Sequence, residues 1–325
     1  MARSAIPEPV TAVTDLAGAW LPLRLEQVER RLAEIAAGHG EPIAADAGST
    51  LAAGGKRMRP LLVLLCAGRE AGEEAIRAAT AIELVHMATL VHDDVLDDAP
   101  MRRGRPTVVA NAGRARALAT GDLLFSRAFA ELAAPGSEAQ VAALATASVA
   151  LARGELAQRQ DAYHADVSAE RYYLRCRLKT AALFECACVV GVDRPEPERE
   201  ALAAFGREIG LAFQLLDDVL DVIGPTERTG KARGADLLDG TVNLPLIRAR
   251  DRDRGLSSLD LRGLDERAAE QVCDRIAATG ATQTVRAEAR ERVERAKSGL
   301  REAELTAGDR HLFELVADGV VERYS

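Results

Sequence analysis

The sequence contains few aromatic residues and no excess of positive charge, and both absences limit what the protein binds. Aromatic side chains make up 3% of the 325 residues, so little is available to stack on nucleic-acid bases. The net charge is −8 at neutral pH, whereas proteins that bind nucleic acids need Lys and Arg to neutralise phosphates. Together these two features argue against a nucleic-acid partner.

The chain also lacks the cysteine pattern of a disulfide-stabilised or zinc-binding protein. Its five cysteines are odd in number and form no Cys-x-x-Cys pair, which indicates reduced thiols in a cytosolic protein. They are Cys66, Cys176, Cys186, Cys188 and Cys273. The first residues, MARSAIPEPVTAV, lack the apolar core of a signal peptide, and no run reaches the roughly 18 apolar residues of a membrane span. We therefore expect a cytoplasmic protein without an integral membrane span.

Proline is sparse, and Ala and Leu, which are strong helix formers, are abundant. Helical periodicity is expected over 20–37, 61–68, 73–98, 119–134, 137–162, 168–190, 196–223, 265–280, 284–303 and 309–324. We expect loops at 38–50 and 224–243, and poorly ordered residues at 1–15. No segment alternates like a strand, and no linker is long enough to separate domains. The sequence thus predicts a single large all-α domain over 1–325.

The pentapeptide Asp-Asp-Val-Leu-Asp occurs twice, at 93–97 and at 217–221, each time at the end of an apolar helix. At about 100° per residue, Asp93 and Asp97 share one helix face with His86, and Asp94 projects to the side. In the second copy, the side chains on one sector beside the apolar stripe are Gln214, Asp217, Asp218 and Asp221. Each predicted core-facing helix therefore presents a row of carboxylates along one edge.

These carboxylates destabilise the helices at this position, because the dipole of a helix disfavours each anion near its C-terminus by about 0.3–1 kcal/mol. A solvated acidic helix end is the simpler interpretation, but such ends seldom follow nine apolar residues and seldom repeat a pentapeptide. The alternative is that cations neutralise them. Oxygen ligands without His or Cys favour a hard ion, and carboxylates from two sides with waters and phosphate oxygens describe a Mg²⁺ site shared with a diphosphate.

Basic residues cluster beside both acidic motifs. Gly54 and Gly55 precede Lys56, Arg57 and Arg59 at a predicted helix start, where backbone amides can approach an anion. The other candidate cations are Arg102, Arg103, Lys179 and Lys231. Any one of them alone is more often a solvated surface charge. As a set they could hold two separate diphosphates, because Arg grips phosphate bidentately and Lys acts as a point charge.

With these motifs the chain resembles the trans-isoprenyl diphosphate synthases, also called polyprenyl synthetases, over about residues 50–250. The resemblance is carried, in order, by GGKRMRP, HDDVLDD, MRRG, RGE, KT, FQLLDDVLD, GKARGADL and LP. It implies a helical bundle around a deep central cavity and a homodimer. It also implies that an allylic diphosphate ionises and that isopentenyl diphosphate attacks the resulting cation, with about three Mg²⁺ ions per active site.

The resemblance assigns a role to each candidate residue. It implies Asp93, Asp97 and Asp217 as metal ligands, with Asp94, Asp218 and Asp221 acting through water or neighbouring groups. It places Arg102, Lys179 and Lys231 on the allylic diphosphate, and Lys56, Arg59, His86 and Arg103 on that of isopentenyl diphosphate. Thr180, Gln214 and the Lys179 carbonyl would face the allylic cation. The chain departs from the family pattern at Thr241 and Asn243, where Lys and Thr are common.

Product length depends in this family on residues before the first aspartate. Here Thr89, Ala88 and Val85 are small, and each helical turn of about 5.4 Å leaves room for roughly one more isoprene unit. We therefore expect a medium- or long-chain product, about C30 or longer, with a short-chain synthase of roughly C15–C20 as the alternative. Three further alternatives remain open. One is that the small residues merely permit helix packing. The other two are that the protein is a terpene cyclase or a non-catalytic subunit of a heteromeric synthase.

Overall fold

The computed structural model describes residues 8–55, 57–134, 137–191, 194–224 and 233–322. Nearly every segment there is helical, and the two strands form one two-residue antiparallel hairpin, so the all-α prediction is confirmed. The first half contains α1 (Glu8–Ala17), α2 (Trp20–Ala37), α3 (Ile43–Ala52), α4 (Met58–Ala67), α5 (Glu73–Leu96), β1 (Met101–Arg102), β2 (Arg105–Pro106), α6 (Val108–Ala112), α7 (Arg114–Ala133) and α8 (Glu138–Asp161).

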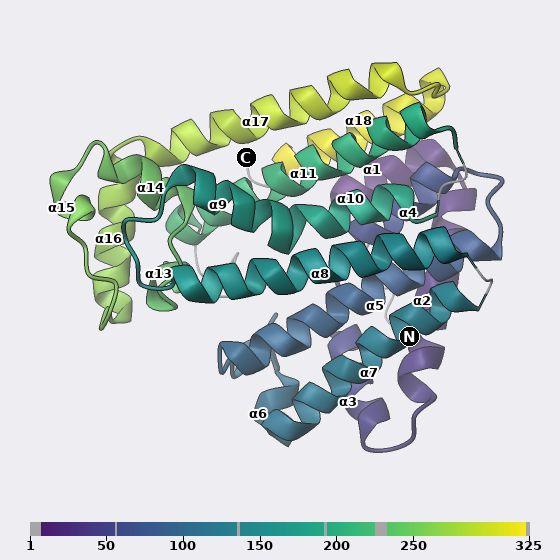
Figure 1. The fold of residues 1–325 in the computed structure, drawn as a ribbon, viewed down its shortest axis with the longest axis horizontal. Helices are drawn as coiled ribbons and strands as arrows, with labels where there is room; N and C mark the ends of the chain where they lie inside the picture. Colours follow the sequence, from purple (N-terminus) through teal and green to yellow (C-terminus); the bar gives the residue numbers. More distant parts are fainter. Residues whose placement is uncertain (1–7, 56, 135–136, 192–193, 225–232, 323–325) are drawn as a thin grey trace.

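The second half of the chain continues the bundle. It contains α9 (Ala169–Cys176), the π-helix η1 (Arg177–Ala181), α10 (Ala182–Val189), α11 (Glu196–Ile223), α13 (Ala235–Leu238), α14 (Leu244–Arg250), α15 (Arg254–Ser257), α16 (Glu266–Ala278), α17 (Ala281–Gly299), the short 3₁₀ turn η2 (Leu300–Glu302) and α18 (Ala307–Glu322). In Figure 1 the helices α8, α11 and α17 run along the long axis, and α13 to α16 gather at the left end. The C-terminal ends of α5 and α11 both lie toward that end.

The predicted stripe on α11 is buried. Leu202, Phe205, Ile209 and Leu216 are each at most 2% exposed, and the helix packs against α10, α16, α17 and α18. By contrast α5 is buried around most of its surface by α2, α4 and α7, and its many alanines allow those close approaches. Both helices that end in an acidic motif are thus held by the core along their length.

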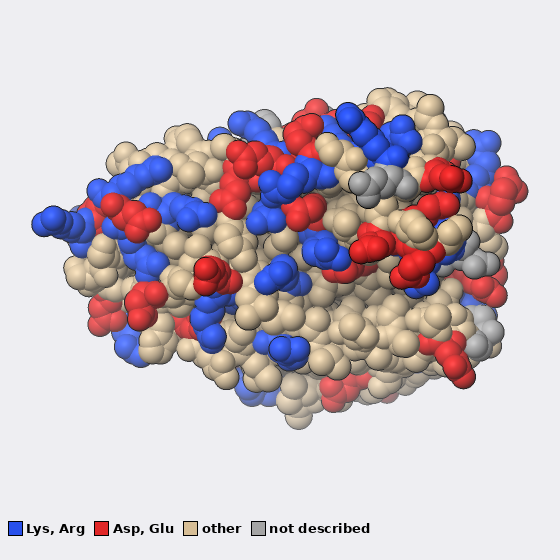
Figure 2. Space-filling model, turned by 45° about the horizontal axis from the view of Figure 1, so that its top comes forward, with Lys and Arg blue, Asp and Glu red and all other residues tan. Residues whose placement is uncertain are grey.

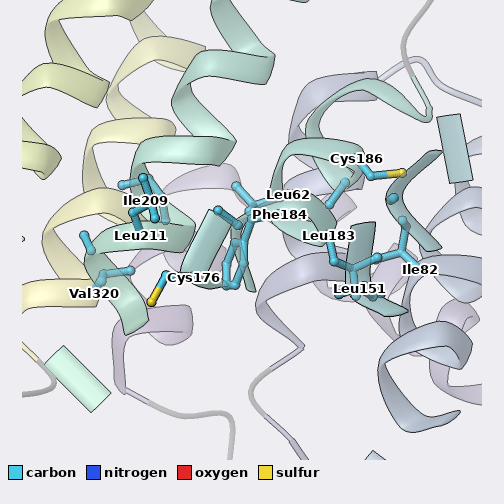
Figure 3. Close-up of a cluster of buried hydrophobic side chains, with 14 of the residues drawn as sticks. Leu62, Ile82, Leu151, Cys176, Leu183, Phe184, Cys186, Ile209, Leu211 and Val320 are labelled. Atoms are coloured by element: carbon cyan, nitrogen blue, oxygen red, sulfur yellow. The ribbon is translucent and has the colours of Figure 1, made fainter. Parts of the chain in front are cut away.

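Buried apolar side chains form a cluster that reaches from Val13 on α1 to Val320 on α18. In Figure 3, Leu62 of α4, Leu151 of α8 and Phe184 of α10 lie in the same part of it. Each buried Leu or Phe contributes about 1.5–3 kcal/mol relative to leaving it in water. The cluster therefore joins elements from both halves of the chain.

Charges of both signs are interspersed on the face shown in Figure 2. Several charged side chains form ion pairs that join different helices. For example, Arg275 of α16 lies 2.7 Å from Asp253, the residue that caps α15, and this pair is exposed. Exposed pairs of this kind contribute about 0–1 kcal/mol each, so the apolar cluster dominates the stability of the bundle.

Two expectations about the secondary structure of the first 50 residues were wrong, and the expected loop at 224–243 contains the short helix α13. Residues 8–17 form helix α1, because Val13 and Ala17 are buried against neighbours that include α18. The expected loop at 38–50 contains helix α3, where Ala47 is fully buried and Asp46 accepts two hydrogen bonds from Arg116 of α7. In both cases tertiary contacts outweigh a weak local helical signal.

Candidate active site

Three aspartates lie at the C-terminal end of α5, and each faces a different cation. The pairs are Asp93 with Lys179 at 3.9 Å, Asp94 with Arg102 at 2.6 Å and Asp97 with Arg159 at 2.5 Å. Asp94 is buried, whereas Asp97 is exposed. A helix C-terminus disfavours anions, so these three cations offset both the helix dipole and the mutual repulsion of the carboxylates.

Burial raises the pKa of Asp93, although the charge of Lys179 opposes the shift, and the neighbouring Glu155 and Asp97 add to it. A second cation would therefore strongly favour the ionised form.

Glu155 and Arg159 on α8 take part in this cluster, and the sequence did not single them out as site residues. Glu155 pairs with Lys179 and accepts a hydrogen bond from Arg159 at 2.8 Å. Burial works against its ionisation, yet Lys179 and Arg159 together lower the pKa of Glu155. The sequence signals for the pair are the RGE motif, which ends at Glu155, and the four-residue helical spacing.

Lys179 and Thr180 project from the π-helix η1, and two glycines let other helices approach it closely. A Cβ on Gly154 of α8 would lie 2.5 Å from the Lys179 backbone nitrogen, and one on Gly210 of α11 would lie 2.7 Å from the Ala181 Cα. Real side chains do not fit at such distances. Glycine at both positions therefore seats η1 between α8 and α11, and π-helical turns of this kind often occur at functional sites.

Asp218 is the buried member of the second motif, at 3% exposed. Its Oδ1 accepts a hydrogen bond from Gln214 Nε2 at 2.8 Å, and its Oδ2 accepts one from the Tyr172 hydroxyl at 2.6 Å and one from Leu244 N at 3.2 Å. Burial raises the pKa of Asp218 to about 7, and the nearby Asp236 adds to the shift against these three donors. Both oxygens are engaged by protein groups.

The other two aspartates of the second motif differ from Asp218 in their surroundings. Asp217 is exposed, and Asp221 is partly buried and accepts a hydrogen bond from the Asp236 backbone at 3.3 Å. The segment after this motif is held by Asn243, whose side chain caps α14 and also donates to Asp236 at 3.4 Å. Asn243 therefore has a structural role in this chain.

A continuous series of contacts connects the two acidic motifs. Asp93 faces Lys179, the next residue Thr180 donates to Gln214 Oε1 at 2.6 Å, and Gln214 donates to Asp218. The end of α5 and the end of α11 thus lie on either side of η1.

A second group of cations surrounds His86 on α5. Burial lowers the pKa of His86 well below its usual value, and the charges of Arg59 and Arg103, followed by Arg57 and Arg102, lower it further. Burial also lowers the pKa of Arg59 to about 10, with Glu83 opposing, so this guanidinium stays charged at neutral pH. A neutral imidazole beside charged guanidiniums can donate or accept a hydrogen bond at a bound anion.

The hairpin after α5 directs the two neighbouring arginines. Arg102 pairs with Arg105 across the hairpin, and the intervening Arg103 and Gly104 both have positive φ, as in a type I′ turn. Arg102 therefore turns to Asp94, and Arg103 donates to the carbonyl of Gly54. Both arginines line a recess together with Asp94 and residues from α3, α5 and α6.

Two expected site residues, Lys56 and Lys231, lie outside the residues that the structure describes. Within the described ranges, no three His, Cys, Asp or Glu side chains come together closely enough to hold a metal ion by themselves. No helix in these ranges is long and apolar enough to cross a membrane.

Several known proteins are similar to this chain in sequence or in fold. The sequence profile of the polyprenyl synthetase family matches residues 41–276. Heptaprenyl diphosphate synthase component 2 of Geobacillus stearothermophilus is 40% identical over 253 residues, which cover 76% of this chain and 79% of that protein. A short chain isoprenyl diphosphate synthase of Methanothermobacter thermautotrophicus is 35% identical and covers 84% of this chain and 88% of its own.

Among solved structures, the polyprenyl synthase from Caulobacter crescentus complexed with calcium and isoprenyl diphosphate is similar, with a TM-score of 0.87 and 32% identity. The match covers 94% of this chain and 96% of that one. The fold is therefore that of the all-α isoprenoid synthases. The chain belongs to the polyprenyl synthetase family and is a prenyltransferase, a trans-polyprenyl diphosphate synthase.

Proposed function

We propose that the enzyme condenses isopentenyl diphosphate head-to-tail with an allylic diphosphate, and that its product is about C30 or longer. The observation that carries the reaction is the contact series from Asp93 through Lys179, Thr180 and Gln214 to Asp218. The carboxylates at the end of α5 lie on one side of η1, and those at the end of α11 lie on the other. Lys179 of η1 is the cation between them. A single diphosphate could be held there by both rows.

In the first step the bond between the allylic carbon and the diphosphate oxygen breaks. Arg102 and Lys179 would bind the departing diphosphate, and Lys231 would join them. Preorganised charge of this kind commonly contributes several kcal/mol to a reaction of this type. The Gln214 oxygen, the Thr180 hydroxyl and the Lys179 carbonyl present the negative ends of their dipoles and would stabilise the allylic cation.

In the second step the terminal alkene carbon of isopentenyl diphosphate bonds to the allylic carbon. Arg59, His86, Arg103 and Lys56 would hold its diphosphate, so the second substrate is bound beside the first. A proton then leaves the new chain and passes to the released diphosphate. The step needs no basic side chain.

The carboxylate oxygens of Asp93, Asp97 and Asp217 suit Mg²⁺, which prefers hard oxygen ligands and commonly keeps waters and substrate phosphates in its coordination shell. We expect about three ions per active site, with Asp94, Asp218 and Asp221 acting through water or neighbouring groups. When bound, Mg²⁺ would supply positive charge to the oxygens of the leaving diphosphate.

The estimate of product length rests on the small residues before Asp93. Ala88 and Val85 are fully buried on α5, and Thr89 is partly buried with its hydroxyl bonded to the His86 carbonyl at 2.8 Å. The proposal takes their small size as room for an apolar chain, whereas the full burial of Ala88 and Val85 favours the alternative that they permit close helix packing. Relatives of this chain include long-chain and short-chain synthases, so a product of roughly C15–C20 is the competing outcome.

The test is to incubate the purified chain with Mg²⁺, labelled isopentenyl diphosphate and geranyl, farnesyl or geranylgeranyl diphosphate, and to size the dephosphorylated products. We expect products of about C30 or longer and none after chelation of the metal. Ala88→Phe and Thr89→Phe should each shorten the product. Unchanged products from both folded variants would show that the chain does not grow there. Release of diphosphate without isopentenyl diphosphate would indicate a terpene cyclase.

A homodimer is part of the proposal, and exposed apolar side chains on α7 and α8 support it. Leu118 is 44% exposed, and Val149 and Leu156, two turns apart on α8, are 59% and 62% exposed. Apolar side chains that are exposed together on one face often mark a surface that binds another protein. Light scattering should give twice the mass of the chain, and Leu156→Glu should reduce it. A monomer that is inactive alone would instead indicate a subunit that needs a different partner.

A further inference from the structure

Tyr172 on α9 is a buried tyrosine next to the candidate active site that the proposed mechanism does not use. It is 1% exposed, and its hydroxyl donates to Asp218 Oδ2 at 2.6 Å. Burial, and then the charge of Asp218, raises the pKa of Tyr172 well above its usual value, so the hydroxyl keeps its proton. The Arg175 guanidinium lies 5.3 Å from the centre of the ring and donates to the Val242 carbonyl at 2.6 Å. These contacts fix the ring in one position.

Asp218 transmits this constraint to Gln214. Its Oδ1 accepts from Gln214 Nε2, so the nitrogen of the amide faces Asp218 and the oxygen accepts from the Thr180 hydroxyl. Because Gln214 Nε2 donates to Asp218 and Gln214 Oε1 accepts from Thr180, these two neighbours specify which end of the amide turns toward each of them. The orientation matters because the opposite end would point a positive dipole at the developing allylic cation.

Without the tyrosine hydroxyl, Asp218 Oδ2 would keep only the longer bond from Leu244 N, at 3.2 Å. Three donors hold the Asp218 carboxylate, so loss of one of them would loosen its position. A loosened carboxylate would in turn hold the Gln214 amide less firmly.

We infer that Tyr172 is a positioning residue for the condensation, and that it acts through Asp218 to hold the Gln214 amide with its oxygen toward Thr180. The inference rests on the proposed function. It gives the buried middle aspartate of the second motif a role distinct from that of Asp217, which is exposed.

The variant that tests the inference is Tyr172→Phe, and its matched control is Tyr173→Phe. The two rings are neighbours on α9, with centroids 5.4 Å apart, but the Tyr173 hydroxyl bonds to Glu288 on α17, away from the acidic motifs. Each substitution removes one hydroxyl and leaves the ring. We expect kcat of Tyr172→Phe to fall about tenfold, the effect of losing about 1.4 kcal/mol in the transition state, with KM for both substrates within about twofold. Tyr173→Phe should keep the wild-type kcat.

A double-variant cycle separates positioning from a general effect on the fold. In a Gln214→Ala background Tyr172→Phe should cause no further loss of kcat, because the amide that it orients is absent. An equal tenfold loss in both backgrounds, or a wild-type kcat for Tyr172→Phe alone, would overturn the inference. A wild-type chain that forms no product at all would overturn the proposed function, and this inference with it.

Discussion

Gly154 on α8 offers the most specific test of how the site is built. An added Cβ would lie 2.5 Å from the Lys179 nitrogen and 2.8 Å from its Cα. These are backbone atoms and cannot rotate away. To restore a carbon contact of about 3.5 Å, α8 and η1 would have to separate by about 1 Å. Gly154→Ala therefore displaces Lys179 and Thr180 without changing either side chain.

Two opposing effects determine the stability of Gly154→Ala. Overpacking in a well-filled interior costs about 1–3 kcal/mol. Alanine in a helix interior is about 1 kcal/mol more favourable than glycine. The net destabilisation is therefore about 0–2 kcal/mol, so the protein should fold. Turnover should suffer far more, because a displacement of about 1 Å in a catalytic group can cost roughly 100-fold.

The assay is the steady-state rate of isopentenyl transfer, measured beside a urea unfolding curve. The matched control is Gly48→Ala on α3, where a Cβ would meet nothing within 4 Å. The control should keep kcat and gain up to about 1 kcal/mol of stability. If Gly154→Ala showed the same gain and a wild-type kcat, the close contact between α8 and η1 would not position the site.

Three further predictions follow from the packing and the charges. Gly240 has φ of +72°, and a Cβ there would lie 2.5 Å from the Tyr163 ring, so Gly240→Ala should lower the free energy of unfolding by about 1–3 kcal/mol in urea. Glu83→Gln should cost about 1.5–3 kcal/mol, because buried Glu83 accepts a charged hydrogen bond from Arg57 at 2.6 Å while Arg57 keeps its second partner, Glu29. Burial raises the pKa of Cys176 to about 12, so native protein should resist iodoacetamide at pH 9, where about a thousandth of this thiol is ionised, and react once denatured.

Each of these predictions has a control variant or a result that would contradict it. Gly263 also has a positive φ but open space around it, so Gly263→Ala should cost less than Gly240→Ala; equal losses would show that the ring contact is unimportant. Glu73 pairs with Arg31 at 3.0 Å and is 58% exposed, so Glu73→Gln should change stability by at most about 1 kcal/mol. Because the pKa of Cys176 is higher in the folded state, this thiol should weaken stability as pH rises from about 9 to 12; rapid alkylation of the native protein at pH 9 would contradict its burial.

The sequence was sufficient to predict the long helices but not the short ones. The helix expected over 20–37 is present with those bounds, and so is the one over 196–223, because each carries a sustained apolar period. Helix α3 and the π-helix η1 were not predicted. Both elements are stabilised by packing against other helices: α3 against α2 and α7, and η1 against α8 and α11 at Gly154 and Gly210. The local sequence does not indicate those contacts.

The same limit applies to the candidate site. The carboxylates and cations could be found because each motif is contiguous in the sequence. Arg159 pairs with Asp97 across 62 residues and Tyr172 bonds to Asp218 across 46, so these partners become visible only in the folded chain. Spacing alone also could not reveal that Asp218 is buried while Asp217 is exposed.

The most direct test of the account is the rate of isopentenyl transfer by Asp93→Ala and Asp217→Ala, one substitution in each acidic row. If both rows hold the metal ions that bind one leaving diphosphate, each variant should lose kcat by at least about 100-fold while keeping its helical circular dichroism. A near-wild-type rate for either variant would contradict the claim that the two rows act together.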